Sequence, residues 1–342
     1  MDNIYIIPIF SIFFYLLNFF FVKNKFLIDK IETSKHKKFM KIKNVPLSGG
    51  ILFLLFVLFF FRDLDNVDYL FLFLIFVVGL LSDVNIINSP TKRLILQLLF
   101  LVLYVSIKET FINYTRVFFI DDLLLYNDLF KIIFTVICLI ILLNGINFID
   151  GSNLLAGGYV ISVLLGLSIF TGFEDDTFLK ENILKSINFL LVFLSFNFFS
   201  KSFLGDSGSY LISIVLGFIC INFANYYINT ISPFFIALLL WYPALENLFS
   251  IIRRVFLEKK PISSADNLHL HHVVNIFISR YIKNNKINNP ITGLLLNSSI
   301  FIFILIGIIY ANQTKVLLCL ILFKSIIYIA TYYFLKKKIL RI

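Results

Sequence analysis

Long apolar runs, separated by short polar segments, make up most of the chain. An α-helix of about 20 apolar residues crosses the hydrocarbon core of a bilayer. The pattern therefore predicts an all-α fold: a polytopic integral membrane protein with about 11 transmembrane helices. The predicted spans are residues 4–22, 46–61, 67–82, 93–108, 130–147, 155–172, 184–200, 207–226, 231–252, 291–310 and 315–335.

The sequence contains no internal repeat and no low-complexity linker, so residues 1–342 are expected to form a single membrane-embedded domain. The first span follows Asp2 and precedes Lys23 and Lys25, which is the reverse of a signal peptide and predicts an uncleaved helix. Alternating spans then give five predicted cytoplasmic loops. They lie near residues 23–46, 83–93, 144–154, 197–207 and 253–290.

Composition and charge agree with a membrane protein. Hydrophobic residues make up 59% of the chain and charged residues 15%, against about 25% in soluble domains. With the N terminus outside, 22 of the 30 Lys and Arg residues fall on the cytoplasmic side and 7 outside, which also predicts a cytoplasmic C terminus. The net charge of +10 thus follows the positive-inside rule, and no nucleic-acid partner is expected. Cys138, Cys220 and Cys319 are expected to be small buried hydrophobic residues.

Acidic residues gather mostly in the outside loops, where they are expected to be solvated. Asp83, Asp150, Asp206 and Asp266 are different, because each belongs to a polar cluster at or near a predicted cytoplasmic helix end. Lipid offers no partners to such groups, so protein, water or ions must satisfy them. Four clusters on one side of the membrane predict a functional site there.

The first two clusters contain carboxylates, amides and cations. Gly79–Asp83 ends one helix, and Ser89–Pro90 opens the next with Lys92 and Arg93, which suit a phosphate ligand. The second cluster, Asn144–Asn153, includes Asn144, Asn147 and Asp150; a polar turn between two helices is the alternative interpretation.

The third cluster runs from Asn197 through Gly205-Asp206-Ser207-Gly208. Asp206 with Asn147 or Asp150 would suit Mg²⁺, which takes one or two carboxylates plus substrate phosphates; helix capping by Asp206 is the alternative. The fourth cluster contains His269, His271 and His272, beyond Arg253. No Cys or further His is available to complete a zinc site, so these side chains are expected to hold an anionic substrate, most plausibly a diphosphate. Ser263 or Ser264, with Asp266, is expected to cap a short helix that carries the histidines.

Together the clusters resemble the polyprenyl-phosphate N-acetylhexosamine-1-phosphate transferases, a family that includes the phospho-MurNAc-pentapeptide translocase. The matching residues are spread along most of the chain. They are Gly79–Gln97; Asn144, Asn147, Asp150 and Gly151; Phe203, Gly205, Asp206, Gly208 and Ser209; His269, His271 and His272; and Pro46–Gly50 with His36 upstream. The His-x-His-His spacing is similar to that of the branch that primes O-antigen, capsule, enterobacterial common antigen or wall teichoic acid.

The resemblance implies a reaction and its participants. Undecaprenyl phosphate attacks the β-phosphorus of a UDP-N-acetylhexosamine, UMP leaves, and the sugar-1-phosphate is joined to the lipid. Mg²⁺, with Mn²⁺ as an alternative, is the implied cofactor, and the bacterial cytoplasmic (inner) membrane is the implied location. A homodimer is left open, and so are the identity of the sugar and the glycan pathway.

The resemblance also assigns roles to residues. Asp206 and Asn147 are implied metal ligands, and Asp83 and Asp150 are implied catalytic carboxylates. The implied substrate-binding residues are Lys92, Arg93, Asn144, Asn147, Asn197, Arg253, His269, His271 and His272.

The sequence departs from the family pattern at Ser82-Asp83, where two adjacent aspartates are usual, and at Asn153-Leu154, where Asp and Gly are common. Which carboxylate would act as a base is therefore open. The competing hypothesis is a transporter or flippase of lipid-linked sugars. Transporters place their polar groups near the bilayer midplane, whereas these clusters lie at predicted helix ends.

Overall fold

The structure is a computed structural model that describes residues 6–28, 45–61, 64–170, 177–259, 261, 266, 268–282 and 284–340. The predicted loop segment with His36, and Ser263 and Ser264, lie outside the described residues.

The described residues are almost entirely helical, which confirms the all-α prediction, and each predicted span coincides with a helix or a bent pair. These elements are α1 (Ile6–Asn24), α2 (Gly49–Phe60), α3 (Asn66–Asp83), α4 (Pro90–Lys108), α6 (Asp128–Ile149), α7 (Leu155–Phe170), α8 (Thr177–Phe198), α9 (Gly205–Tyr226), the pair α10 (Pro233–Leu239) and α11 (Trp241–Ile252), α13 (Asn285–Ile309) and α14 (Thr314–Leu340). Three further elements were not predicted as spans: α5 (Phe118–Tyr126), the π-helix η2 (Arg253–Leu257) and α12 (Leu270–Ile278).

The protein is a polytopic membrane protein, but its described helices differ in length. Six of them are long and apolar enough to cross a membrane, or seven if α10 and α11 form one span bent by 67°. Helix α2 has only 12 residues, about 18 Å of helix, and α7 has 16, so both are shorter than a typical span. A helix or a bent pair is therefore present for each of the eleven predicted spans. That all eleven cross the membrane completely stays a prediction.

Capping residues explain where several helices begin. Asp65 forms a capping box with Asp68 at the start of α3, and Ser89 precedes Pro90 at the start of α4. Asn127 accepts a hydrogen bond from Phe130 N at the start of α6. The bend between α10 and α11 precedes Pro243, which has no N–H to donate.

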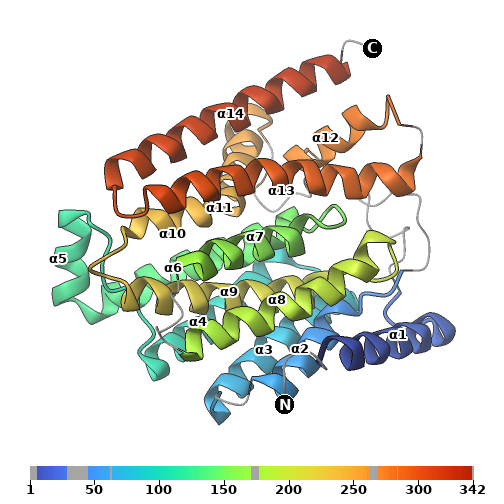
Figure 1. Ribbon diagram of the computed structural model, residues 1–342, viewed down its shortest axis with the longest axis horizontal. Helices are drawn as coiled ribbons and strands as arrows, with labels where there is room; N and C mark the ends of the chain where they lie inside the picture. Colours follow the sequence, from blue (N-terminus) through green and yellow to red (C-terminus); the bar gives the residue numbers. More distant parts are fainter. Residues whose placement is uncertain are drawn as a thin grey trace.

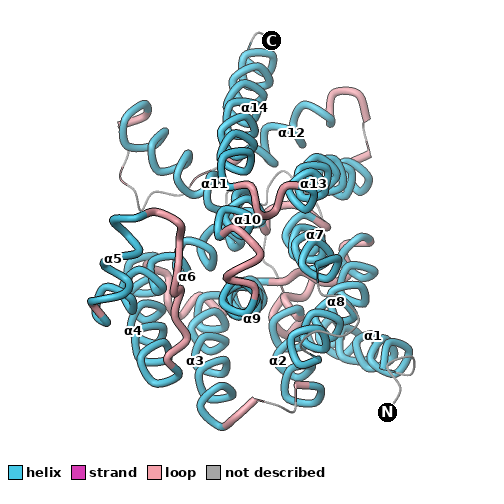
Figure 2. The backbone as a smooth tube through the Cα atoms, turned by 60° about the vertical axis from the view of Figure 1, so that its left-hand side comes forward, coloured by secondary structure: helices cyan, strands magenta, loops and turns pink. Residues whose placement is uncertain are grey.

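Helix α9 is the centre of the bundle. In its most apolar 18-residue stretch 83% of residues are buried, against 22% in α4 and in α14, and Figure 2 shows it surrounded by the other long helices. Gly79 of α3 allows close approach, because an added Cβ would lie 2.3 Å from Ser207 Cα. The start of α9 and the end of α3 are therefore in direct contact.

Large apolar side chains on the outer helices face outward, as a lipid-facing surface requires. Cys319 of α14 belongs to this exposed surface and Cys138 is half-buried, so the prediction of buried cysteines is confirmed only for Cys220. Helix α14 lies at the periphery of the bundle (Figure 2), so one side of this apolar helix is exposed.

The bundle has two distinct ends. In Figure 1 α5 lies at the left end, whereas α12 and the C-terminal end of α14 lie at the right. Arg280, just after α12, donates to Lys338 O at 3.0 Å and Ile339 O at 3.1 Å, and so caps the end of α14.

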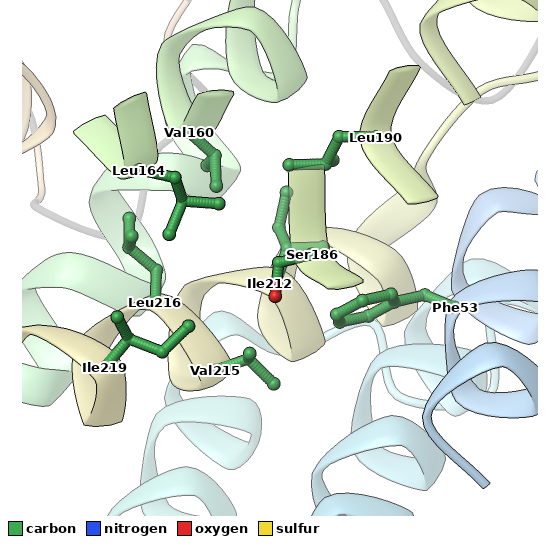
Figure 3. Close-up of a pocket in the computed structure, with 9 residues that line it drawn as sticks. All are labelled: Phe53, Val160, Leu164, Ser186, Leu190, Ile212, Val215, Leu216 and Ile219. Atoms are coloured by element: carbon green, nitrogen blue, oxygen red, sulfur yellow. The ribbon is translucent and has the colours of Figure 1, made fainter. Parts of the chain in front are cut away.

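One small cavity lies inside the bundle between α2, α7, α8 and α9 (Figure 3). Eight of its nine lining side chains are apolar, and the hydroxyl of Ser186 is the only polar side-chain group among them. A polar ligand or a bound water needs several polar partners, so this cavity is a packing gap and not the site.

Candidate active site

Several hydrogen bonds join the end of α3 to the start of α9. Asp83 Oδ1 accepts from Asp206 N at 2.8 Å, and Asp83 Oδ2 accepts from Ser207 N at 3.1 Å and Ser207 Oγ at 2.7 Å. Helix α9 has no side-chain cap of its own at Leu204. Asp83 therefore caps α9 from a neighbouring helix and faces the positive end of its dipole.

Gly205 makes this approach possible in two ways. Its φ of +72° lies in the left-handed region, which favours glycine. An added Cβ would also lie 2.8 Å from Asp83 Oδ2. Gly205, noted in the sequence, is thus needed for the contact between Asp83 and the start of α9.

Asp206 forms a compact group with Ser82 and Arg93. Its Oδ2 accepts from Arg93 at 2.5 Å and from Ser82 Oγ at 2.5 Å, and Ser82 Oγ accepts from the same guanidinium nitrogen at 2.8 Å. The ion pair is partly open, with 22% of the Arg93 side chain and 26% of the Asp206 side chain exposed. Ser82, where a second aspartate was expected, thus hydrogen-bonds both charged groups.

The oxygen atoms around Asp206 have the chemistry that a hard cation needs. Asp206 Oδ1 makes no hydrogen bond within the described part of the chain, and Mg²⁺ takes one or two carboxylates together with substrate phosphates. The described residues hold no group of three His, Cys, Asp or Glu side chains suited to a metal, so a cage built from protein carboxylates alone is not formed there. The donor set fits a Mg²⁺ that shares Asp206 with a phosphate ligand.

The last turns of α6 connect this group to the histidines. Asn147 Oδ1 accepts from Ser209 Oγ at 2.9 Å, which places it beside the first turn of α9. Asn144 donates to Gln97 Oε1 at 3.3 Å and to Ile140 O at 3.0 Å. Asp150 is the half-buried C-cap residue of α6. The predicted second cluster therefore lies at the same end of the bundle as Asp206.

Asn197 and Asn153 have structural contacts. Asn197 is 5% exposed; its amide oxygen accepts from Leu154 N at 2.7 Å and its amide nitrogen donates to Ser202 O at 2.9 Å. Asn153 donates to Asn197 O at 2.7 Å and also pairs with Asn289 of α13. These amides join the ends of α6, α8 and α13, and a direct substrate contact by Asn197 would require breaking its backbone hydrogen bonds.

The three histidines pack on the end of α6. The His269 ring lies 5.4 Å from the Phe148 ring and stacks at 5.6 Å on His271, with 4° between the planes. His271 rests on Gly151, where an added Cβ would lie 2.1 Å from its Nε2. His272 lies 4.1 Å from the His271 ring and is the most exposed of the three. Thus the histidine and Asn144–Asn153 clusters, separated in sequence, meet in the fold.

The predicted cap of α12 is replaced by a different one. Asp266 accepts from Leu268 N at 2.9 Å, but the N-cap residue is His269, which has no side-chain cap hydrogen bond. Instead Glu246 Oε1, from α11, accepts from Leu270 N at 3.2 Å. Capping by Asp266 was therefore wrong, because a buried carboxylate of another helix occupies that position.

Arg253 is 1% exposed and is neutralised within the protein. It donates to Glu258 at 2.5 Å and to Asp266, and its guanidinium lies 5.9 Å from the Tyr332 ring. Burial alone would raise the pKa of Asp266, but His269 and Arg253 outweigh it and hold that pKa at about 2. Lys92, in contrast, is exposed at the start of α4, next to Arg93 in sequence, and forms no ion pair with Asp206.

The glycosyl transferase family 4 model matches residues 67–224. Among similar proteins, the undecaprenyl-phosphate alpha-N-acetylglucosaminyl 1-phosphate transferase of Thermotoga maritima is 27% identical over 307 residues, covering 88% of this chain and 89% of its own. The probable undecaprenyl-phosphate N-acetylglucosaminyl 1-phosphate transferase of Bacillus subtilis is 27% identical over 247 residues, 72% of this chain and 63% of its own. The decaprenyl-phosphate N-acetylglucosaminephosphotransferase of Mycolicibacterium smegmatis is 32% identical over 162 residues.

The last of these alignments spans 42% of this chain and 40% of the mycobacterial protein, so the chain covers less than two thirds of the length of two of these relatives. The Thermotoga match, however, extends over most of both chains. The family match contains Asp83, Arg93, Asn147 and Asp206, which the fold brings to one end of the bundle. Residues 67–224 belong to glycosyl transferase family 4, and the chain is similar to polyprenyl-phosphate N-acetylglucosaminyl-1-phosphate transferases.

Proposed function

We propose that the protein transfers N-acetylhexosamine-1-phosphate from a UDP-sugar to undecaprenyl phosphate and releases UMP. In this reaction an oxygen of the lipid phosphate forms a bond to the β-phosphorus of the UDP-sugar. The bond between that phosphorus and the bridging oxygen breaks, and UMP leaves with the oxygen and the electron pair. The names of the relatives support this reaction class.

The observation that carries the proposal is the Arg93–Asp206–Ser82 group beside the capped start of α9. Phosphoryl transfer between anionic partners requires positioning and charge compensation more than covalent participation by the protein. Asp83 already accepts from the backbone N–H groups of Asp206 and Ser207, so the partly exposed Arg93 is the group that would meet a phosphate, as a planar cation. Asp206 and Asn147 would hold Mg²⁺, which would offset the charge of the diphosphate.

Other residues of the chain have separate proposed tasks. Asp83 is proposed to hold the first turn of α9 in place, and Asp150 remains the proposed catalytic carboxylate at the end of α6. His271 and His272 are proposed to hold the sugar nucleotide's diphosphate over the end of α6. Asn144, Lys92 and Arg253 remain proposed substrate contacts, although Arg253 is already paired with two carboxylates.

The same proposal includes the location. The polar end of the bundle is proposed to face the cytoplasm of a bacterium, with the N terminus outside, because most Lys and Arg residues fall on that side. A priming step in cell-surface polysaccharide synthesis, as for O-antigen or capsule, is the proposed pathway.

A transporter of lipid-linked sugars is the second candidate, favoured by one buried cation. Lys324 of α14 is 6% exposed and lies 4.8 Å from the Trp241 ring and 4.7 Å from the Phe303 ring. It therefore lies against two aromatic rings in the interior of the bundle. The other polar clusters lie at helix ends, however, which supports the transferase.

A release assay tests the proposal. Purified protein in detergent is incubated with Mg²⁺, undecaprenyl phosphate and a panel of UDP-N-acetyl sugars, and UMP is measured. We expect UMP release that requires the lipid and is lost in Asp206→Ala. Asp68→Asn is a matched control, because Asp68 is a buried carboxylate that pairs with Tyr104 and Lys108 at the opposite end of α3 from Asp83. Folded protein that releases no UMP from any sugar would contradict the transferase.

A further inference from the structure

A buried carboxylate in α11 is bound by three different donors. Glu246 is 0% exposed. Its Oε2 accepts from Tyr328 Oη of α14 at 2.7 Å, and its Oε1 accepts from Leu270 N of α12 at 3.2 Å and lies 3.0 Å from His269 Nδ1. One side chain thus joins α11, α12 and α14, which lie next to one another in Figure 1.

Such a carboxylate requires compensation. A buried charge is costly unless it is paired and hydrogen-bonded, and these donors satisfy that requirement for Glu246. An ionised carboxylate can only accept, so His269 must present an N–H at Nδ1 to it. This contact fixes the rotation of the imidazole ring and keeps a proton on Nδ1.

The second ring nitrogen of His269 is also directed toward the protein. His269 Nε2 lies 3.8 Å from Asp266 Oδ2, and Ser250 Oγ lies 3.2 Å from Nδ1. With 6% of the residue exposed and carboxylates near both nitrogens, His269 is poorly placed to bind an anionic substrate. It is, however, stacked on His271, which in turn rests on Gly151.

The geometry points to a role for Glu246 that no sequence motif assigns. We propose that Glu246 is a positioning residue: it caps α12 and orients His269, and His269 orients His271 and His272 toward the end of α6. His269 then acts through its neighbours instead of contacting the diphosphate itself. This proposal rests on the proposed function for its kinetic consequences, but the contact itself does not depend on it.

The first measurement is spectroscopic and requires no substrate. The chain has only four histidines, so selective ¹⁵N-histidine labelling gives few NMR signals. We expect one Nδ1–H proton shifted strongly downfield by its bond to the carboxylate, lost in Glu246→Gln and retained in Asp68→Asn. A spectrum unchanged by Glu246→Gln would overturn the assigned contact.

The second measurement is kinetic. Glutamine keeps the volume of Glu246 but has one acceptor oxygen and no charge, so it cannot satisfy all three donors. We expect KM for the UDP-sugar to rise about 10- to 100-fold with a smaller change in kcat, as expected for the loss of a hydrogen bond to a charged group. Glu246→Asp, which keeps the charge on a shorter side chain, should recover part of the loss.

The outcomes separate the two proposals. An unchanged KM in folded Glu246→Gln protein would refute the positioning role. Wild-type protein that releases no UMP, while Glu246→Gln still loses the downfield signal, would refute the transferase and leave the Glu246–His269 contact established. Equal loss of kcat in Glu246→Gln and Asp68→Asn, with KM unchanged in both, would indicate general destabilisation and also overturn the positioning role.

Discussion

Replacing Asp83 by Asn tests whether this carboxylate acts by holding the start of α9. The carboxylate accepts three hydrogen bonds, two of them from backbone N–H groups of Asp206 and Ser207. In the variant, the amide oxygen can replace Oδ2 and keep both contacts to Ser207. The amide NH₂ would then face Asp206 N at the former distance of 2.8 Å, donor against donor.

The size of the effect follows from the contacts that are lost. A hydrogen bond to a charged group contributes about 1.5–3 kcal/mol. Removing the negative charge from the helix N-terminus costs a further ~0.3–1 kcal/mol. Together these losses predict that the first turn of α9 opens more easily by about 2–4 kcal/mol, which is at least a tenfold change in a local opening equilibrium.

Hydrogen exchange measured by mass spectrometry reports this opening directly. Peptides covering residues 203–210 should exchange at least tenfold faster in Asp83→Asn than in the wild type. Asp68→Asn, which removes a carboxylate near the opposite end of α3, should leave those peptides unchanged and affect the first turn of α3. Unchanged exchange at residues 203–210 in Asp83→Asn would refute the capping role and favour a purely chemical one.

Two other predictions concern the histidine end of the site. Gly151→Ala places a Cβ 2.1 Å from the original position of His271 Nε2, so the ring must move. KM for the UDP-sugar should rise, and the melting temperature should fall by a few degrees. Unchanged kinetics would contradict the contact between His271 and Gly151. Asp266, with its pKa at about 2 against about 3.9 when unfolded, is ionised above both values; it should contribute roughly 2–3 kcal/mol of stability that is lost only as pH falls from about 4 toward 2. Acid unfolding of Asp266→Asn compared with the wild type measures this contribution, and parallel curves in that range would contradict it.

The apolar pattern was sufficient to locate the long helices. Lipid requires continuous apolar runs, so the ranges of α3, α4, α6 and α9 were close to the predicted ones. The short helix predicted to carry the histidines is present as α12, but α5 was not predicted, because nine residues in a loop carry little periodic signal. The Leu240 bend was also missed, because the apolar run continues through it.

The site was predictable as a set of motifs but not as a set of contacts. The chain separates Ser82 from Asp206 by 124 residues, and only the fold shows that Ser82, where an aspartate was expected, hydrogen-bonds both Arg93 and Asp206. Likewise, the sequence around Asn197 predicted a substrate-binding residue, but in the structure its side-chain amide hydrogen-bonds to the backbone of Leu154 and Ser202. Such assignments depend on distances in the folded protein, which the spacing of residues along the sequence does not give.

Glu246 illustrates what the sequence does signal without locating the partner. A single acid in an apolar, inward-facing segment must have a donor nearby, because an unpaired charge there is costly. Its partners His269 and Tyr328 follow 23 and 82 residues later, so they could be recognised only in the fold.

The most direct test of the central claim follows the β-phosphate. Purified protein is incubated with undecaprenyl phosphate, Mg²⁺ and a UDP-N-acetyl sugar that carries ³²P at the β-position, and the lipid and aqueous phases are separated. Transfer of sugar-1-phosphate predicts that the label enters the lipid phase with release of unlabelled UMP, and that Asp206→Ala abolishes the transfer. Label that stays in the aqueous phase, as UDP or as intact UDP-sugar, would contradict the account.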